Sequence, residues 1–431
     1  MHPSEFERPA TEPNAPSVAS PADASADTLA QARTRSLAMF RTRRELIRWD
    51  AVSEYANQAF AGVHELRRAA QTWGSAALIP TTQKALANVV TVALRADDSN
   101  GEIGDLAYEL LALHAELCNA TPPKPTVLAT WLIDFRFDGT QDYFEPDIAA
   151  YANALGAAGL SLLANRLDEL EAALPPRTDP YDSNRWLIGR YRERLAVASG
   201  DPDAVIASFG DLTRSYRMRD LAKALDEVGA VDQALAYAER ATLLETSFQA
   251  EHAGHFWCEL LHAHRPHEEV AARQVVFDRW PSSKNALALA QAADENNHVE
   301  WSSLAEPVYA KLETQHPGEL IATLLGRGLV DRAWESAERL TTDVRLWTTL
   351  VAAREKTDPA AVVPVLIRLI QTDLEISKPQ NYKSAVARLR QLRRALKATD
   401  AAARFPLIMV ELREENRRRP TLIQAFDRAG F

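Results

Sequence analysis

Apolar residues recur along most of the chain at the three- and four-residue spacing of amphipathic helices, not at the alternating spacing of strands. From Thr28 onward, segments with one apolar face and one face rich in Arg and Glu are separated by turn residues. The pattern therefore predicts an all-α fold. In the first half of the chain we expect helices over residues 29–47, 52–73, 80–94, 103–118, 126–137, 146–155 and 157–174.

Turn and helix-breaking residues divide the chain into parts. The clearest break is PPRTDPYDS, which places a boundary near residues 175–180. Residues 1–27 are rich in Pro, Ala, Ser and acids and have neither a basic start nor an apolar run, so we expect a disordered tail and no secretory signal. The expected parts are the tail, an N-terminal helical domain (28–175), a repeat region (180–375) and a basic helical cap (381–431).

A divergent repeat occupies the second half of the chain. Most units have a helix, a short polar or Gly turn, an acid, and then a small residue (Ala234, Ala271, Ala333) that opens a second helix. Such spacing is typical of stacked helical hairpins of tetratricopeptide type, and the divergence indicates an irregular α-solenoid. One unit is degenerate or missing near Trp301. The recurrences lie at 199–208, 228–241, 264–277, 327–340 and 356–369.

Residues 381–431 are strongly basic within an acidic protein. This segment has 12 Lys and Arg against 5 Asp and Glu, whereas the whole chain carries a net charge of -10. Two helices are expected, separated near Asp400. A phosphate-binding surface is one interpretation, and a solvated or internally paired face, with leucines on the opposite side, is the other. The candidate cations are Arg388, Arg390, Arg393, Arg394, Lys397, Arg417, Arg418 and Arg419.

Composition narrows the classes of protein further. Two cysteines, Cys118 and Cys258, supply neither a disulfide framework nor a four-cysteine zinc site. No window reaches the roughly 18 uninterrupted apolar residues of a membrane span, so we expect a cytoplasmic protein that does not insert into a membrane. No Gly-rich phosphate loop, nucleophile elbow, HExxH motif or dinucleotide fingerprint occurs, and we expect neither an enzyme nor a cofactor.

The stretch WLIDFRFDGTQDYFEPDIAAY (131–151) resembles a calcium-binding loop in its spacing. Acids stand at positions one, five, nine and twelve when counting starts at Asp134, and Gly139 stands at position six. Position three, which normally supplies an oxygen ligand, is Arg136, and position eight, normally apolar, is Gln141. A simple turn between two helices is therefore preferred to a calcium site.

The segment AEHAGHFWCELLHAHRPHEE (250–269) holds half of the ten histidines. On a helix His255, Cys258 and His262 would share one face, which is a possible zinc ligand set, although no fourth ligand can be identified. Packing of Cys258 as an ordinary core residue is the alternative, and it is preferred.

Three segments together resemble the long helical region that follows the zinc finger in bacterial SWIM zinc-finger proteins. They are 97–132, 138–160 and the closing NYKSAVARLRQLRRAL…FPLIMVELREENRRRPTLIQAFDRAGF. The finger itself, a C-x-C pair followed by a C-x-H pair, is absent from this sequence, so no binding role of the finger is carried over. The resemblance implies a helical accessory module and supplies no catalytic residue.

These observations lead to two functional hypotheses. The first is a non-catalytic scaffold or adaptor that binds a protein or peptide through the helical repeats, since stacked hairpins expose an extended face. The second is a nucleic-acid-associated accessory protein that binds through the basic C-terminal helices. The sequence identifies neither the partner nor the face of the solenoid that it contacts.

Overall fold

The computed structural model describes residues 28–176, 182–295, 299–341 and 343–431. These residues form α-helices and short 3-10 turns with no strand among them, which confirms the all-α prediction. They divide into two compact units. Unit 1 comprises the described residues up to Gly210 together with Ala224–Ala230, and unit 2 comprises the remainder. The predicted tail (1–27) and most of the predicted boundary (177–181) lie outside the described residues.

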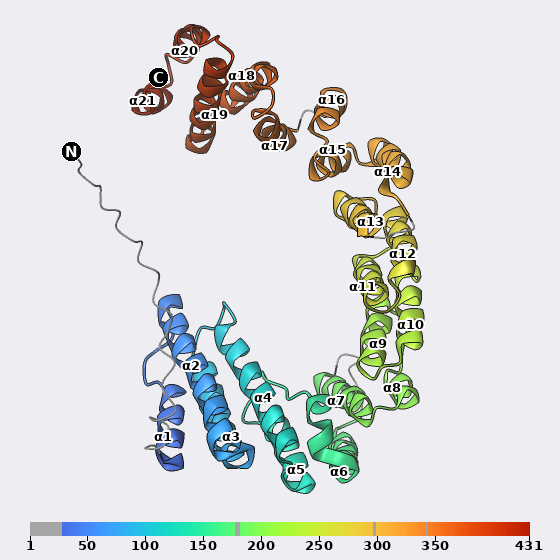
Figure 1. Cartoon of the computed structure of the whole chain (residues 1–431). Helices are drawn as coiled ribbons and strands as arrows, with labels where there is room; N and C mark the ends of the chain where they lie inside the picture. Colours follow the sequence, from blue (N-terminus) through green and yellow to red (C-terminus); the bar gives the residue numbers. More distant parts are fainter. Residues whose placement is uncertain (1–27, 177–181, 296–298, 342) are drawn as a thin grey trace, which may run out of the picture. The chain divides into compact units, whose positions relative to one another are not determined.

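Unit 1 has a single hydrophobic core that extends from Phe40 to Tyr191. Its helices contact more than their sequence neighbours, because α1 also meets α3, α2 meets α4, and α4 meets α6. The helices of unit 1 are α1 (Leu29–Met39), α2 (Trp49–Trp73), α3 (Ser75–Ala93), α4 (Glu102–Ala120), α5 (Pro125–Phe137), the 3-10 helix η2 (Ile148–Tyr151), α6 (Ala152–Ala172), α7 (Ser183–Ser199) and α8 (Pro202–Ser208), as labelled in Figure 1.

Helix α1 is shorter than the sequence predicts, because it ends at Met39 and not at residue 47. Tertiary hydrogen bonds occupy the carbonyl groups beyond that point. The Tyr55 hydroxyl donates to the Phe40 carbonyl (3.2 Å), and the Asp97 N–H donates to the Leu46 carbonyl (2.8 Å). Long-range partners therefore replace the helical bonds that this segment would otherwise form.

Proline and glycine behave differently from the prediction in α3 and α6. Helix α3 begins at Ser75 and carries Pro80 inside it, although Pro80 was expected to open the helix. The first turn contains the buried Leu78 and Ile79, so packing holds it despite the missing proline N–H. In α6 the break expected near residue 156 is present, since Gly156 has φ +53° inside the helix.

One described segment, Ile148–Ala172, passes a length and composition test for a membrane span. In this structure the segment includes the break at Gly156 and buries Leu155, Leu163 and Leu167 in the core of unit 1. It contacts α4, α5 and α7. About 33% of its most apolar stretch is buried inside unit 1, and the buried residues lie on the face that packs against these helices.

Unit 2 is built from helices that follow one another in chain order (Figure 1). From α10 to α20 each helix contacts the next one in the chain, α15 also touches both α13 and α17, and α21 packs against α19. Neighbour-dominated packing of this kind is compatible with the predicted irregular solenoid. Helix α9 (Ser215–Glu227) contributes to both units. The further helices are α10 (Val231–Leu243), α11 (Phe248–His264), α12 (Pro266–Arg279), α13 (Ser283–Glu295), α14 (Trp301–Gln315), α15 (Pro317–Gly326), α16 (Val330–Leu340), α17 (Val344–Arg354), α18 (Pro359–Glu375), α19 (Pro379–Ala398), α20 (Arg404–Glu415) and α21 (Pro420–Ala429).

The five sequence recurrences coincide with α8, α10, α12, α16 and α18. Three of the turns before these helices contain a glycine with positive φ, namely Gly200, Gly229 and Gly328. Of the small residues predicted to permit close packing, Ala234 and Ala333 are fully buried. Ala271 is exposed instead, and its neighbour Ala272 is buried, so the prediction was wrong by one position there.

The C-terminal section contains three helices, α19, α20 and α21, where two were expected. The expected break is present at Asp400, which adopts φ +55°. The second break follows from Pro420, which stands in the first turn of α21 and cannot donate the N–H that would continue α20.

Candidate functional site

An open cleft of about 370 Å³ lies in unit 1 beside the acidic loop. It is formed by α4, the loop before η2, α7 and the end of α9. The side chains that line it carry three carboxylates, two guanidinium groups and two phenols. The lining residues are Tyr108, Glu145, Pro146, Asp147, Ile148, Arg190, Tyr191, Arg194 and Glu227.

Gln141 fixes the loop that forms one wall of the cleft. Its buried side-chain amide donates to the Phe135 carbonyl (2.7 Å) and the Phe144 carbonyl (3.0 Å). Its side-chain oxygen accepts from the N–H groups of Tyr143 (2.9 Å) and Phe144 (2.8 Å). One glutamine thus satisfies four backbone groups, which explains how an irregular segment stays ordered at the edge of the core.

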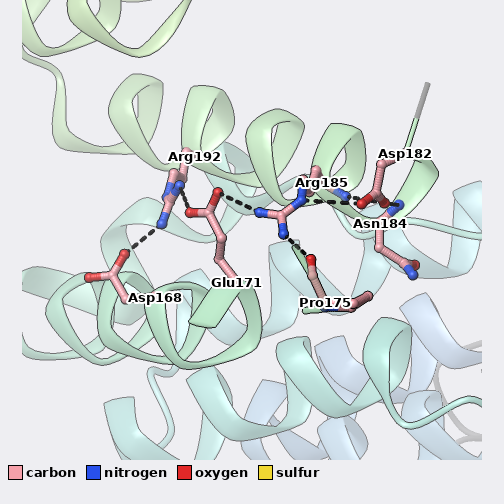
Figure 2. A network of polar contacts seen from close by, with 7 residues as sticks. All are labelled: Asp168, Glu171, Pro175, Asp182, Asn184, Arg185 and Arg192. Atoms are coloured by element: carbon pink, nitrogen blue, oxygen red, sulfur yellow. Dashed lines mark hydrogen bonds and ion pairs between the residues drawn. The ribbon is translucent and has the colours of Figure 1, made fainter. Parts of the chain in front are cut away.

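Helix α7 forms the opposite wall, and Figure 2 shows the polar network that holds it against α6. Arg192 binds Asp168 (2.6 Å) and Glu171 of α6, and Arg185 donates to the Pro175 carbonyl (2.6 Å). Arginine forks that reach two acceptors define one orientation of the two helices. The network therefore fixes the positions of Arg190, Tyr191 and Arg194, which α7 presents to the cleft.

The carboxylates of the cleft are not paired equally. Arg194 binds Asp147 with two hydrogen bonds (2.7 and 3.0 Å) and Glu227 with a contact of 2.7 Å. Glu145, in contrast, lies 3.8 Å from the Nε of Arg136, which is beyond hydrogen-bond distance. Glu145 is therefore the cleft carboxylate with the weakest pairing in the described part of the chain.

Two tyrosines line the same cleft. The Tyr191 side chain is 3% exposed, and its hydroxyl has no hydrogen-bond partner among the described residues. Burial raises the pKa of Tyr191, and the nearby Glu145 raises it further. Tyr108 is 50% exposed and packs edge-on against Phe144 with ring centroids 5.9 Å apart. Burial and Glu145 also raise the pKa of Tyr108, so both phenols remain protonated donors at neutral pH.

The acidic loop does not assemble a calcium site. Asp138 accepts hydrogen bonds from the N–H (2.8 Å) and hydroxyl (2.7 Å) of Thr140, which is ordinary turn geometry. No group of three His, Cys, Asp or Glu side chains suited to a metal occurs in the described ranges. The preferred interpretation as a turn agrees with this geometry.

The histidine-rich helix α11 also separates its three candidate ligands. His255 shares a hydrogen bond of 2.8 Å with the Asn285 side-chain oxygen on α13, and His262 contacts the Glu269 carboxylate at 2.8 Å. Cys258 is fully buried, and burial raises its pKa to about 12. The two histidines therefore have partners on different elements, while Cys258 packs in the core, and the three residues do not converge on one point.

A second cysteine lies beside a histidine and has the composition of a nucleophile and its base. The Sγ of Cys118 is 3.7 Å from the Nε2 of His114. Both residues are fully buried; burial lowers the pKa of His114 to about 4 and raises that of Cys118 to about 12. These shifts favour a neutral thiol and a neutral imidazole, whereas a reactive pair needs the thiolate.

Five of the eight candidate cations of the basic section have intramolecular partners, and one of them, Arg393, donates to the Gly430 carbonyl (3.5 Å). Arg388 and Asp373 form an ion pair of 2.9 Å in which both side chains are largely buried. Arg419 donates to the Leu374 carbonyl, and Arg417 binds Glu414. Arg394 is exposed and lies 3.5 Å from Glu355. Partners within the protein therefore engage some of the cations on α19 and some of those at residues 417–419.

Four cations of α19, two of them with partners elsewhere in the unit, line an open groove of about 480 Å³. Arg390, Arg393, Arg394 and Lys397 form one side, and Ala429 and Phe431 form the other. No Asp or Glu side chain is among the described residues that line the groove. The structure thus brings these four predicted residues together and separates them from Arg388, Arg417, Arg418 and Arg419.

Sequence reasoning missed Tyr108 and Asn285, and it offered Tyr191 only as one of several aromatic residues that could line a groove or pack in the core. Tyr108 and Tyr191 lie on α4 and α7, and neither helix shows by itself which partner its tyrosine will face. The only signal was indirect, since Tyr191 is an aromatic residue in an otherwise charged helix, RYRER. Asn285 gave no signal at all, because a polar residue at a helix start is usually taken as a cap.

Comparison with known families supplies a classification without a function. The chain belongs to DUF6880, a family of unknown function, whose sequence profile matches residues 18–279. The match covers all described residues of unit 1, the unit that contains the cleft, and continues through α12 of unit 2. No curated protein matches the chain.

Proposed function

We propose that this DUF6880 member is a non-catalytic helical-repeat adaptor that binds a protein partner. One observation carries the proposal. Side chains from two successive hairpins, on α11 and α13, are held together at the surface of unit 2. A surface that is ordered before binding loses less conformational entropy when a partner docks.

The ordered row begins at Phe248, which is 67% exposed and lies against the His252 ring with centroids 4.1 Å apart. His255 follows; its Nε2 shares a hydrogen bond with Asn285, and its Nδ1 lies 3.4 Å from the Nζ of Lys284 on α13. Asn285 is buried and also donates to Glu251 (3.0 Å) and to the Trp280 carbonyl (2.7 Å). The row therefore presents an aromatic anchor beside polar groups whose positions are fixed, which is a composition suited to protein recognition.

The surroundings of His114 and Cys118, the pair whose side chains resemble a catalytic base and nucleophile, support the proposal that the protein is non-catalytic. His114 and Cys118 are enclosed in the core and are neutral, so they lack both access to substrate and a nucleophile. The cleft in unit 1 contains carboxylates and phenols but no Ser, Cys, His or Lys side chain among its lining residues.

Affinity capture with matched variants tests the adaptor proposal. The protein is used as bait in lysate of its own host, beside a Phe248→Ala/Lys284→Ala variant and a Glu239→Ala control on the exposed side of α10. We expect a stoichiometric partner with the unmodified protein and the control, and its loss with the double variant. Recovery of no stoichiometric partner under several conditions would contradict the proposal.

A second candidate function is association with nucleic acid through the groove on α19. The favouring observation is that four cations line this groove and no Asp or Glu side chain is among its described lining residues. Arg390, Arg393, Arg394 and Lys397 recur at helical spacing along about 10 Å of the helix, a length that spans a few phosphates of a single strand. In this interpretation the protein is an accessory factor beside a partner that supplies a finger, in line with its resemblance to SWIM-associated helical regions.

Salt-dependent retention tests the second candidate. Binding to heparin and to single-stranded DNA is measured at two salt concentrations for the full chain, for Arg390→Ala/Lys397→Ala and for Arg417→Ala/Arg418→Ala. Both variants remove two positive charges, so net charge is matched. We expect loss of retention with the first pair only. Equal behaviour of the two variants, or no retention of the unmodified chain, would exclude this role.

A further inference from the structure

The cleft of unit 1 carries a charge arrangement that the proposed function does not yet use. Two of its three carboxylates, Asp147 and Glu227, form ion pairs with the same arginine, Arg194. The third, Glu145, has only the 3.8 Å contact with Arg136. A carboxylate oxygen accepts strong hydrogen bonds from a cationic donor at 2.7–2.9 Å. Glu145 therefore retains the capacity to bind one more cation.

Arg190 is the second arginine that lines the cleft, and its contacts are with other groups than Glu145. Its guanidinium carbon lies 5.8 Å from the centroid of the Trp186 ring, one turn earlier on the same helix. Its Nη1 lies 3.6 Å from Glu193 on that helix. Arg190 is thus engaged along α7, so a cation that binds Glu145 more closely than the 3.8 Å contact of Arg136 has to come from outside the cleft.

Two phenols stand where such a cation would enter. The Tyr191 hydroxyl is buried without a partner among the described residues, although a buried hydroxyl is normally hydrogen bonded. The half-exposed Tyr108 adds an aromatic ring, and aromatic rings attract ammonium and guanidinium groups. Glu145 raises the pKa of both tyrosines, which places its charge close to both rings.

We propose that this cleft binds a lysine or arginine side chain of a protein partner, with Glu145 as the counter-ion and Tyr108 and Tyr191 as the aromatic and hydrogen-bonding walls. The proposal rests on the adaptor function, because a partner has to supply the side chain. The volume of about 370 Å³ exceeds one side chain, so the flanking peptide backbone enters with it. Ile148 and Pro146 provide apolar contact for the aliphatic stem.

Short peptides test the cleft without knowledge of the partner. The probes are Ac-Ala-Lys-Ala-NH2, Ac-Ala-Arg-Ala-NH2 and their norleucine and aspartate counterparts, titrated into the full chain and followed by NMR or calorimetry. We expect binding of the lysine or arginine peptide and none of the norleucine or aspartate peptide. Equal binding of the norleucine peptide, or preference for aspartate, would overturn the proposal.

Single substitutions test whether the cationic peptide binds in this cleft. Glu145→Gln keeps the shape and removes the charge, so we expect affinity for the cationic peptide to fall about ten- to hundredfold. Tyr191→Phe keeps the ring and removes the hydroxyl, for an expected loss of about three- to tenfold. The control Asp142→Asn removes an exposed acid from the same loop, outside the cleft lining. An equal loss with Asp142→Asn, or none with Glu145→Gln, would mean that the cleft is not the site.

The result of the peptide titrations can be distinguished from the result of the affinity capture that tests the adaptor proposal. Peptide binding that depends on Glu145, without any captured partner, would retain the cleft as a cation site and remove the adaptor function. A captured partner whose binding is unchanged by Glu145→Gln would retain the adaptor function and reject this cleft. Melting temperatures of all variants, compared with that of the unmodified chain, show whether a variant has simply unfolded.

Discussion

The two units bury the apolar faces of their amphipathic helices through different arrangements of helix contacts. In unit 1 contacts such as those of α2 with α4 and of α4 with α6 join helices that are not sequence neighbours, around one core. In unit 2 nearly every helix depends on its neighbours in the chain. A local defect should therefore weaken unit 1 as a whole, whereas in unit 2 it should remain near the altered repeat.

The largest expected effect comes from truncating Trp347 in unit 2. This side chain is fully buried, lies edge-on to Trp334 with centroids 5.1 Å apart, and donates to the Thr341 carbonyl at 3.1 Å. Trp347→Ala should cost about 3–5 kcal/mol of local stability. In hydrogen exchange, protection should fall in α16 to α18 and persist in α2 to α5. The control Trp186→Ala removes an exposed indole and should leave both regions protected; equal loss in both units would contradict the topological difference.

The second prediction concerns unit 1 and its buried histidine. Burial lowers the pKa of His114 to about 4, below its ordinary value of 6.5, so the folded state favours the neutral ring. The corresponding stability is present above pH 6.5 and is lost as the pH falls toward 4. We expect the free energy of unfolding of unit 1 to decrease by about 3 kcal/mol over that interval.

Urea denaturation at several pH values measures this dependence. His114→Gln retains a polar side chain near the Tyr151 hydroxyl, which lies 3.1 Å from the His114 Nδ1, but it does not titrate. This variant should lose most of the slope between pH 6.5 and 4. His64→Gln, at an exposed position of α2, should keep it. A slope that survives in His114→Gln would assign the pH dependence to other groups.

A smaller effect is expected from the buried ion pair of the C-terminal section. Arg388→Ala leaves the buried Asp373 carboxylate without its cation and should cost about 2–3 kcal/mol at pH 7. Burial already raises the pKa of Asp373, and Arg388 opposes that rise. Without Arg388 the pKa of Asp373 rises further, so protonation at a lower, acidic pH should relieve part of the loss. Arg394→Ala, which removes an exposed cation of the same helix, should cost under about 1 kcal/mol at either pH.

The sequence predicts helices wherever the apolar period alone decides, and α4 is an example, since the expected 103–118 falls within Glu102–Ala120. It fails where distant residues decide. The end of α1 depends on Tyr55 and on Asp97, which bind carbonyls of the segment that was expected to be helical. The cleft depends on Tyr108 and on residues of α7, whose meeting is set by tertiary packing. Charge runs were informative about composition but not about pairing, as the buried partner of Arg388 shows.

The smallest expected effect belongs to the surface ion pairs that connect successive hairpins of unit 2. Arg332 binds Glu306 with bonds of 2.7 and 3.1 Å, and Arg339 binds Glu313 at 2.9 Å, one heptad further along the same two helices. The regularity suggests a structural ladder, yet these side chains are largely exposed, and water and salt screen their attraction.

A double-mutant cycle of Arg332→Ala with Glu306→Ala measures the contribution of one such pair. We expect a coupling energy below about 1 kcal/mol that decreases further between low and high salt. Apolar contacts between neighbouring helices would then carry the stability of unit 2, and the ion pairs would mainly define the register of one hairpin against the next. A coupling above about 2 kcal/mol that persists at high salt would reverse this assignment, and unit 2 would depend on its polar surface as much as unit 1 depends on its shared core.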